Sequence, residues 1–342
     1  MKEKILLGMS GGVDSTYSVL ALRRQGYDVV GAFLQMSDDS DVASAHRAAE
    51  ALGVPLTVVD CRERFRDVVI ENFLSEYSSA RTPNPCVICN RYVKIDTLCE
   101  TAKAMKISRV ATGHYARVGF DEETGRYYIA KAKDITKDQS YVLWRLTQEQ
   151  LSMLTFPLGE LSKSVVKSEA KEMALPNADA PESQEICFIP SNDYVSYIER
   201  KKGKFPEGDF LDENGKVIGR HGGIIHYTIG QRKGLGLSLG KPAFVTAIDS
   251  VKHTVTVAGE EKVFSTSLSC NTLNFMSMVP VEKGTVSAEG KIRYSAKPTG
   301  AKIEISGDRA DVCFEQAVRA VTPGQSVVFY KEERILFGGI II

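Results

Sequence analysis

The sequence lacks the features that would take a protein out of a reducing, aqueous compartment. No run of 18 apolar residues occurs, so no membrane span is predicted. The short apolar stretch near Met1 ends in glycines, unlike a signal peptide. The seven cysteines are an odd number and are scattered except for one C-x-x-C pair, which argues against a secreted disulfide framework. These absences favour a cytoplasmic protein with no membrane partner.

An excess of charge of either sign is also missing. Lys and Arg number 43, as do Asp and Glu, so the formal net charge is +0. A neutral chain has no overall attraction to nucleic acid, and any RNA partner must be held by a local patch. Two basic stretches, ERKKGK (199–204) and GQRKG (230–234), could supply such a patch or could be solvated loops.

What the chain does contain is a change of pattern along its length. Early apolar runs alternate with helical segments expected at 15–25, 41–52 and 91–106, which predicts a parallel sheet; the runs are KILLGM (4–9), DVVGAFL (28–34), PLTVVD (55–60) and RVAT (109–112). Beyond about residue 240, short alternating runs predict a small barrel or sandwich; they are FVTAI (244–248), TVTV (254–257), KIRY (291–294), AKIEI (301–305), DVCF (311–314) and QSVVFY (325–330).

We therefore predict an α/β protein in three parts. The first, residues 1–195, is a catalytic domain built on a Rossmann-like parallel sheet. The second, residues 196–268, is a small, glycine-rich and basic linking domain. The third, residues 269–342, is an all-β barrel.

The stretch GMSGGVDS, Gly8 to Ser15, follows the first expected strand and opens the first expected helix. Backbone N–H groups and a helix N-terminus at this place suit an anion. The P-loop lysine is absent, and the dinucleotide pattern G-x-G-x-x-G also fails, so neither a P-loop kinase nor a dehydrogenase fits. A plain glycine turn between strand and helix is the alternative.

Within this stretch, Ser10 to Ser15 is similar to the SGGxDS signature of the ATP pyrophosphatases, which split ATP between the α and β phosphates. The resemblance implies ATP as a cofactor and Mg²⁺ oriented by Asp14, although Asp14 could instead stabilise the helix dipole. The residues that it places at the nucleotide are Gly8, Met9, Ser10, Gly11, Gly12, Val13, Asp14 and Ser15.

Five further motifs extend the resemblance over nearly the whole chain: PNPCVICN (83–90), TGHYAR (112–117), KDQSYVL (137–143), SQEICF (183–188) and HGGIIHYTIGQRKGLG (221–236). Together they resemble the bacterial tRNA-specific 2-thiouridylases. That family adenylates C2 of the wobble uridine and replaces the oxygen with sulfur from a protein-bound persulfide, releasing AMP and pyrophosphate. The resemblance implies two partners, a tRNA and a sulfur donor that is a sulfur-relay protein or a cysteine desulfurase.

Carried over motif by motif, the resemblance assigns roles to single residues. Cys187 would bear the persulfide, and Cys89 would be the nucleophile that helps to release its sulfur. Leu34 and Gly113 would contact ATP. The segment at the target base would be Asn84, Pro85 and Cys86, and the tRNA contacts would be His114, Lys137, Asp138, Gln139, Arg293, Tyr294 and Gln325.

The reacting cysteines need activation, because a free thiol is only about 3% thiolate at neutral pH. The helix expected from Arg91 would place Cys89 just ahead of a helix N-terminus, with Lys94 nearby. We therefore expect a lowered pKa at Cys89.

Position 86 departs from the family pattern PNPDxxCN, because Cys stands where Asp is usual. The pair Cys86 and Cys89 could bind zinc, but no second C-x-x-C or spaced His pair completes four ligands. With Cys187 they could hold three irons of a [4Fe–4S] cluster, or they could form a reversible disulfide. The persulfide route remains the leading interpretation.

Two other function classes stay open from the residues alone. An ATP pyrophosphatase that hands an activated carbonyl to ammonia would give Cys89 and Cys187 no role. A binding scaffold with a vestigial phosphate loop would not need Ser10, Asp14 and Ser15 intact.

Overall fold

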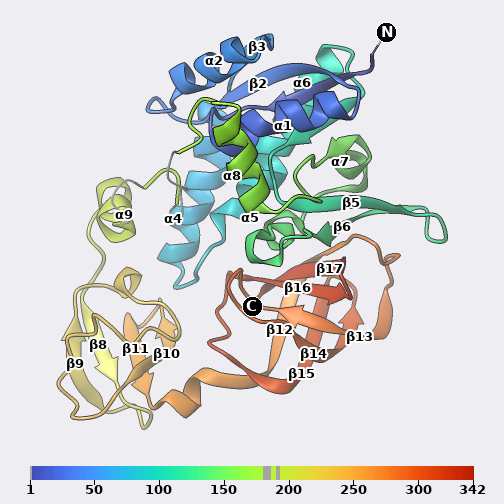
Figure 1. The fold of residues 1–342 in the computed structure, drawn as a ribbon. Helices are drawn as coiled ribbons and strands as arrows, with labels where there is room; N and C mark the ends of the chain where they lie inside the picture. The colour runs from blue at the N-terminus through green and yellow to red at the C-terminus, as the bar shows by residue number, and fades with distance from the viewer. Residues whose placement is uncertain (1, 180–185, 190–192) are drawn as a thin grey trace.

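The protein is described by a computed structural model that covers residues 2–179, 186–189 and 193–342. Figure 1 shows three parts, with the N-terminal sheet and its helices at the top, a barrel below, and a smaller β unit to the lower left. Within the described ranges, no helix is long and apolar enough to cross a membrane.

The N-terminal part confirms the predicted parallel sheet. Its five strands run in the order β3-β2-β1-β4-β7, and all neighbours are parallel. Their bounds are β1 Lys4–Gly8, β2 Asp28–Gln35, β3 Leu56–Asp60, β4 Arg109–Thr112 and β7 Leu154–Thr155. The carboxyl ends of β1, β2 and β4 meet at one edge, where parallel sheets bind ligands.

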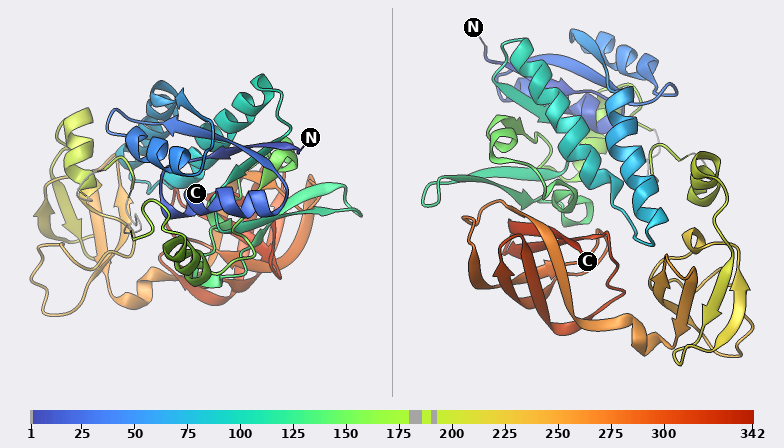
Figure 2. Two further views of the ribbon diagram at one scale, coloured as in Figure 1. Left: turned by 45° about the horizontal axis from the view of Figure 1, so that its top comes forward. Right: turned by 180° about the vertical axis from the view of Figure 1, so that it is seen from behind.

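Helices cover both faces of this sheet (Figures 1 and 2). Ile5 and Leu7 of β1 pack with Val19 of α1 on one face, while Leu6 packs with Leu98 of α6 (Asp96–Ala104) on the other, as the two-residue period of a strand requires. The helices of this part are α1 Val13–Arg24, α2 Val42–Ala51, α3 Arg62–Phe65, α4 Glu71–Ser78, α7 Gln148–Met153 and α8 Lys163–Glu172.

The helix expected at 91–106 begins six residues earlier, so that prediction was wrong in its start. It runs through α5 (Pro85–Cys89), the π-helical segment η2 (Asn90–Ile95) and α6 (Asp96–Ala104). Asn84 is the N-cap and accepts a hydrogen bond from the Val87 N–H at 3.4 Å, and a proline follows at the first helical position. Cys89 therefore lies inside a helix rather than ahead of one.

The C-terminal part is a closed six-stranded barrel, which confirms the expected fold class. Its strands follow the order β12-β15-β14-β13-β16-β17, and pairing of β12 with β17 closes it. Their bounds are β12 Phe264–Phe275, β13 Lys283–Lys291, β14 Thr299–Ser306, β15 Arg309–Arg319, β16 Ser326–Lys331 and β17 Arg334–Ile341. The strand expected at 291–294 was wrong, because β13 ends where its pairing with β16 ends, at Lys291.

A hairpin from the N-terminal part joins the barrel sheet. Its strands are β5 (Ala116–Asp121) and β6 (Arg126–Lys131), and β6 pairs antiparallel with β17. Trp144 is fully buried beside this junction and donates its indole N–H to the Ser326 hydroxyl at 2.9 Å. The barrel is thus fastened to the catalytic part by main-chain pairing and by a buried aromatic residue.

The linking part forms a mixed four-stranded sheet in the order β10-β11-β8-β9. Its elements are α9 Tyr194–Lys202, β8 Gly208–Leu211, β9 Val217–His221, β10 Phe244–Asp249 and β11 Thr254–Ala258. Its apolar core continues into α4 through Phe73 and Tyr77. The Phe188 ring lies 5.3 Å from that of Phe73, so residues 186–189 pack against α4.

Candidate active site

Hydrogen bonds of a serine side chain within the phosphate loop fix the shape of the loop. The Ser15 hydroxyl donates to the Gly12 carbonyl at 3.0 Å and accepts from the Ser10 N–H at 3.2 Å. Gly12 is the N-cap of α1 and provides no side chain that could bond the first-turn N–H groups. These donors therefore remain directed toward an anion at the helix N-terminus.

Two glycines are required by space around this loop. Gly11 has φ +81°, and a Cβ there would lie 2.7 Å from the Ala45 backbone nitrogen. A Cβ on Gly113 would lie 3.2 Å from the Ser15 nitrogen, so the end of β4 approaches the loop closely. A larger residue at position 11 would push the loop out of shape, and one at position 113 would require the loop to shift by a few tenths of an ångström.

The loop lines a cavity of about 550 Å³ at the carboxyl edge of the sheet. The cavity brings together several of the expected nucleotide contacts. These are Gly8, Met9, Ser10, Asp14, Ser15, Leu34 and Gly113, with His114 and Gln139 beside them. Gly11, Gly12 and Val13 support the loop and do not line the cavity.

Asp14 is already paired with a cation of the protein. Both of its carboxylate oxygens lie 2.6 Å from Nζ of Lys163, which is buried at the start of α8. The Tyr115 hydroxyl donates to the same carboxylate at 2.9 Å. Lys163 thus places one positive charge beside the carboxylate that was expected to orient Mg²⁺.

The expected nucleophile reaches the wall of this cavity. The Cys89 thiol lies 3.8 Å from the sulfur of Met36, and Met36 lines the cavity. Cys89 packs in an apolar cluster with Phe65 and Val93, and Phe188 packs against the same cluster. Cys187, next to Phe188, is exposed and is thereby held on the side of α4 and α5 that carries Cys89.

The Cys89 thiol is not activated as predicted. Burial raises the pKa of Cys89 to about 12, and nearby Lys94 opposes this only in part. Desolvation by surrounding atoms also raises the pKa of Cys86, although its side chain is exposed. The expected lowering at Cys89 was therefore wrong, because the residue lies inside a buried helix and not at a helix N-terminus.

A resident metal is not supported by the described residues. In the ranges that the structure covers, no group of three His, Cys, Asp or Glu side chains is arranged to hold a metal ion. Cys86, Cys89 and Cys187 all fall in those ranges, so the [4Fe–4S] and zinc interpretations do not fit this arrangement. All seven cysteines are free thiols.

Three family models match the chain in succession. They are described as the tRNA methyl transferase HUP domain (residues 3–191), the tRNA methyl transferase PRC-barrel domain (195–259) and the aminomethyltransferase β-barrel domain (265–341). A tRNA-specific 2-thiouridylase MnmA of Clostridium perfringens is 45% identical over 99% of this chain and 98% of its own length. The enzyme of the same name from Clostridioides difficile is 42% identical over 100% and 98%.

The chain belongs to the tRNA-specific 2-thiouridylase family. Among solved structures, a 4-thiouridine synthetase–RNA complex with bound ATP is 14% identical, covers 58% of this chain and 50% of its own, and has a TM-score of 0.36.

Two of the seven residues that were expected to contact tRNA, His114 and Gln139, line the nucleotide cavity. His114 bonds Thr112 through Nδ1 at 2.7 Å, and burial, with Lys94 nearby, lowers its pKa to about 3. Gln139 accepts from the Tyr115 N–H at 2.9 Å and lines the cavity. Both side chains are thus neutral hydrogen-bonding groups at its rim.

Asp138 is committed to the interior. Its carboxylate accepts from the Ala132 N–H at 2.9 Å and from the Ser140 hydroxyl at 2.8 Å. These bonds fix the turn that presents its half-exposed neighbour Lys137.

The barrel residues that were expected to contact tRNA differ in exposure and in their hydrogen bonds. Tyr294 is 48% exposed, and Nζ of Lys291 lies 5.5 Å from its ring. Arg293 donates to the Ala320 and Arg319 carbonyls. Gln325 donates to the Thr82 and Pro83 carbonyls at 3.0 and 2.9 Å, and so clamps the barrel to the segment before α5.

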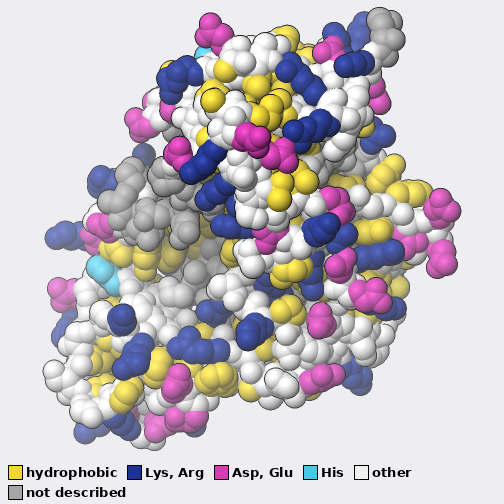
Figure 3. Space-filling model, viewed as in Figure 1, with side chains coloured by type: hydrophobic (Ala, Val, Ile, Leu, Met, Phe, Trp, Pro, Cys, Tyr) yellow, Lys and Arg dark blue, Asp and Glu magenta, His cyan; other side chains and the backbone are white. Residues whose placement is uncertain are grey.

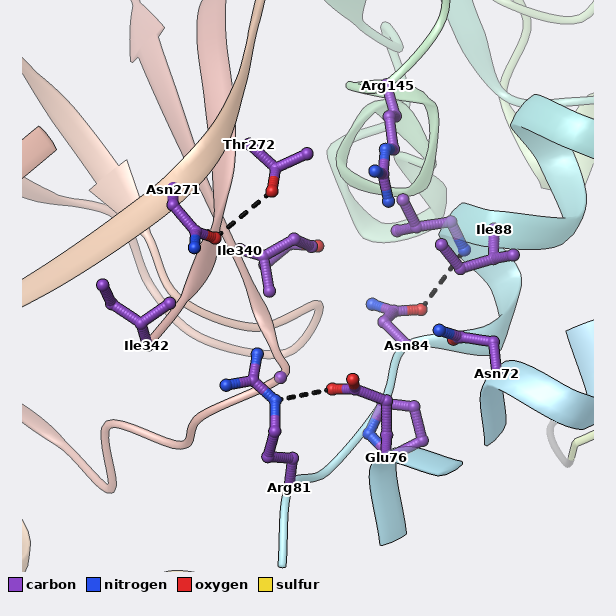
Figure 4. Close-up of a pocket in the computed structure, with 14 residues that line it drawn as sticks. Asn72, Glu76, Arg81, Asn84, Ile88, Arg145, Asn271, Thr272, Ile340 and Ile342 are labelled. Carbon is purple, nitrogen blue, oxygen red and sulfur yellow. Dashed lines mark hydrogen bonds and ion pairs between the residues drawn. The ribbon is translucent and has the colours of Figure 1, made fainter. Parts of the chain in front are cut away.

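A second cavity, of about 390 Å³, lies between α4, α5 and the barrel (Figure 4). Asn84 and Arg145 border it from the catalytic part, and Asn271 and Thr272 border it from the barrel. Asn84 therefore faces this cavity and not the nucleotide cavity. The guanidinium of Arg145 lies 5.4 Å from the Tyr92 ring.

Sequence reasoning missed four residues that shape the site: Met36, Tyr115, Lys163 and Asn177. Asn177 donates to the Gly11 carbonyl at 2.8 Å and so braces the loop from outside. Met36, Lys163 and Asn177 lie outside the motifs, and only the tertiary fold brings them to the site. Tyr115, inside TGHYAR, was the one with a local signal.

Proposed function

We propose that this family member converts the wobble uridine of tRNA to 2-thiouridine with ATP. Family membership makes the chain an ATP-using tRNA sulfurtransferase. One observation most strongly supports the proposal that this chemistry forms 2-thiouridine at the wobble position. The cavity that holds the phosphate loop shares Met36 with Cys89, so nucleotide chemistry and thiol chemistry adjoin.

The first step uses the phosphate loop. N–H groups at the start of α1, with the Ser10 and Ser15 hydroxyls, stabilise the leaving pyrophosphate while the uridine O2 attacks the α-phosphorus. The Leu34 backbone and Gly113 hold the nucleoside. A Mg²⁺ that accompanies ATP would neutralise charge on the phosphates, beside the Asp14 carboxylate that Lys163 holds in place.

The second step uses the two cysteines. The terminal sulfur of a Cys187 persulfide attacks C2, the C–O bond breaks, and AMP leaves with the oxygen. The Cys89 thiolate then attacks the Cys187 sulfur, the S–S bond to the tRNA sulfur breaks, and 2-thiouridine is released. The product is a Cys89–Cys187 disulfide, and an external dithiol must reduce it before the next turnover.

A tRNA approaching this site would meet the barrel and the target-base segment together. Tyr294 can stack on a base, while Lys137, Arg293 and Gln325 border its path. In the target-base segment at the start of α5, exposed Cys86 would lie against the base, while Asn84 at the second cavity and buried Pro85 would hold the segment in place. The chain is neutral overall, and Lys and Arg are mixed with Asp and Glu on the face shown in Figure 3, so recognition rests on these local groups.

The sulfur must come from another protein. Cys187 is exposed, which leaves it accessible to a sulfur-relay protein or a cysteine desulfurase. Lys94 and the two other cysteines lie within electrostatic range of it, so a persulfide would form on the side of the site that carries its acceptor.

The direct test incubates the protein with tRNA, ATP and a persulfide donor and measures AMP, pyrophosphate and modified nucleosides by mass spectrometry. We expect one AMP for each 2-thiouridine. AMP without sulfur in the tRNA, despite a competent donor, would contradict thiolation. Because two family models are described as methyl transferases, a parallel reaction with S-adenosylmethionine is included, and methylated uridine there would also count against the proposal.

A further inference from the structure

Lys94 projects from the helix that carries Cys86 and Cys89. Its neighbours include both the residues of the phosphate loop and the cysteines. It lines the nucleotide cavity together with Ser10, Asp14 and His114. It was expected only as a nearby charge, and no role is given to it by the motif resemblance. Among the described residues, no carboxylate forms an ion pair with it.

The π-helical segment η2 explains how the Lys94 side chain can lie both at the nucleotide cavity and near Cys89. In an α-helix, residues five apart point about 140° away from each other, since each residue turns about 100°. A π turn is wider and places residue i+5 above residue i. Cys89 directly precedes η2 and Lys94 lies within it, so the π turn brings Lys94 to the face that carries Cys89.

The contacts of Cys89 point to the same cavity wall. Its sulfur touches Met36, and Met36 and Lys94 both line the cavity. Leu98, one α-helical turn after Lys94, lines it as well. The face that carries Cys89, Lys94 and Leu98 is therefore the one turned to the nucleotide.

We propose that the ammonium group of Lys94 activates Cys89 for sulfur transfer from within the nucleotide cavity. The inference rests on the proposed function and deepens it. Cys89 loses its proton to solvent, Lys94 stays protonated throughout, and the thiolate attacks the Cys187 sulfur. Lys94 forms no covalent bond, and it acts as a positioning residue through Cys89.

The charges around the pair support this assignment. The groups that face Cys89 are Cys86 and Lys94 from its own helix, Cys61 before α3, and Cys187 from the 186–189 segment. His114 faces Lys94 from the end of β4. Lys94 is the one cation in this set, since the low pKa of His114 keeps it neutral. Burial opposes the charge of Lys94, but its thiol neighbours raise its pKa.

The test compares Lys94→Met and Lys94→Arg with a control on the same helix, Lys103→Met, whose ammonium is exposed and paired with Glu149. Iodoacetamide labelling of Cys89 across pH is followed by tandem mass spectrometry that separates it from Cys86. For Lys94→Met we expect the labelling profile to move up by about one pH unit, which lowers the rate at pH 8 about tenfold. Lys94→Arg and Lys103→Met should stay within about threefold of the wild type.

Single-turnover reactions supply the second measurement. Sulfur transfer in Lys94→Met should fall about tenfold or more, while AMP formation falls by less than about threefold. Parallel loss of both steps with an unchanged labelling profile would overturn the inference and assign Lys94 to the nucleotide. If the wild type makes AMP but no 2-thiouridine, the proposed function fails, while the labelling profile still decides the role of Lys94. Thermal unfolding checks folding, and Lys94→Gln replaces Lys94→Met if the latter does not fold.

Discussion

The phosphate loop and the cysteine helix adjoin the same cavity, but they differ in how far their polar groups are prepared for chemistry. Around the loop, Ser15, Asp14 and Asn177 are each fixed by hydrogen bonds or an ion pair. In the cysteine helix, the Cys89 thiol is buried, with a pKa near 12. At pH 7 such a thiol is ionised about once in 10⁵ molecules.

This difference indicates an order of events. The groups of the phosphate loop are already arranged for the step in which uridine attacks ATP, whereas the sulfur half needs a change in its surroundings before Cys89 ionises. Arrival of the tRNA and of the persulfide on Cys187 would supply that change. Holding the thiol protonated until then protects it from oxidation, because the thiolate is the reactive form.

The largest expected effect is a loss of sulfur transfer with ATP activation retained. Cys89→Ser removes the nucleophile, so 2-thiouridine formation should fall by about 10³-fold or more, while AMP formation stays within about threefold. The assay is single-turnover nucleoside mass spectrometry with AMP quantified in the same sample. Cys313→Ser, an exposed cysteine of the barrel, is the control and should behave as the wild type. Full thiolation by Cys89→Ser would remove the sulfur half from the mechanism.

Gly11→Ala should distort the phosphate loop and slow the activation of uridine by ATP. Its Cβ would collide with the backbone at Ala45, and the positive φ adds about 1–2 kcal/mol of strain. We expect AMP formation to fall about 10²-fold, measured as kcat/KM for ATP. The control is Gly26→Ala, which has φ +95° but meets nothing within 4 Å. Equal losses of activity in the two variants would mean that backbone strain, rather than loop shape, is responsible.

Lys163→Met tests whether a lysine replaces a metal at Asp14. Without its ammonium, the carboxylate would repel the polyphosphate, and kcat/KM for ATP should fall about tenfold. The Mg²⁺ concentration for half-maximal AMP formation should not change, and Lys163→Arg should recover part of the loss. Lys171→Met, at an exposed position of the same helix, is the control. A marked gain in Mg²⁺ affinity in Lys163→Met would show that Asp14 is a metal ligand after all.

The smallest effect concerns acid stability. His114 has a folded pKa of about 3, below its ordinary value of about 6.5. The unfolded chain therefore binds a proton between these values that the folded chain does not, and stability falls as pH drops from about 6.5 toward 3. Urea unfolding at several pH values should show His114→Gln to be less acid-sensitive than the wild type. An identical pH dependence in both proteins would contradict a neutral, desolvated His114.

Much of the fold could be predicted from the sequence, because its period-two and helical patterns are strong. The strands at Lys4–Gly8 and Asp28–Gln35 fall within about a residue of the apolar runs that predicted them. The hairpin β5–β6 could not be assigned to the barrel sheet, since its partner β17 lies some two hundred residues further along the chain. Pairing at that separation leaves no local signal.

The site could be predicted where its residues are contiguous in sequence, as in the phosphate loop. It was less predictable where burial sets the pKa of a side chain. Ser10 and Ser15 lie as their spacing suggested. The pKa of Cys89 went the other way, because Asn84 and Pro85 start the helix early and place the thiol in an apolar cluster. The ion pair of Asp14 with Lys163 joins residues far apart in sequence, and only the packing of α8 on α1 creates it.

The central claim is that nucleotide activation and the two cysteines act on one bound base. Its most direct test is a single turnover of the wild type with tRNA, ATP and a persulfide donor, without reductant, followed by non-reducing mass spectrometry. The account predicts one Cys89–Cys187 disulfide for each 2-thiouridine formed. Stoichiometric 2-thiouridine with both cysteines still free would contradict it.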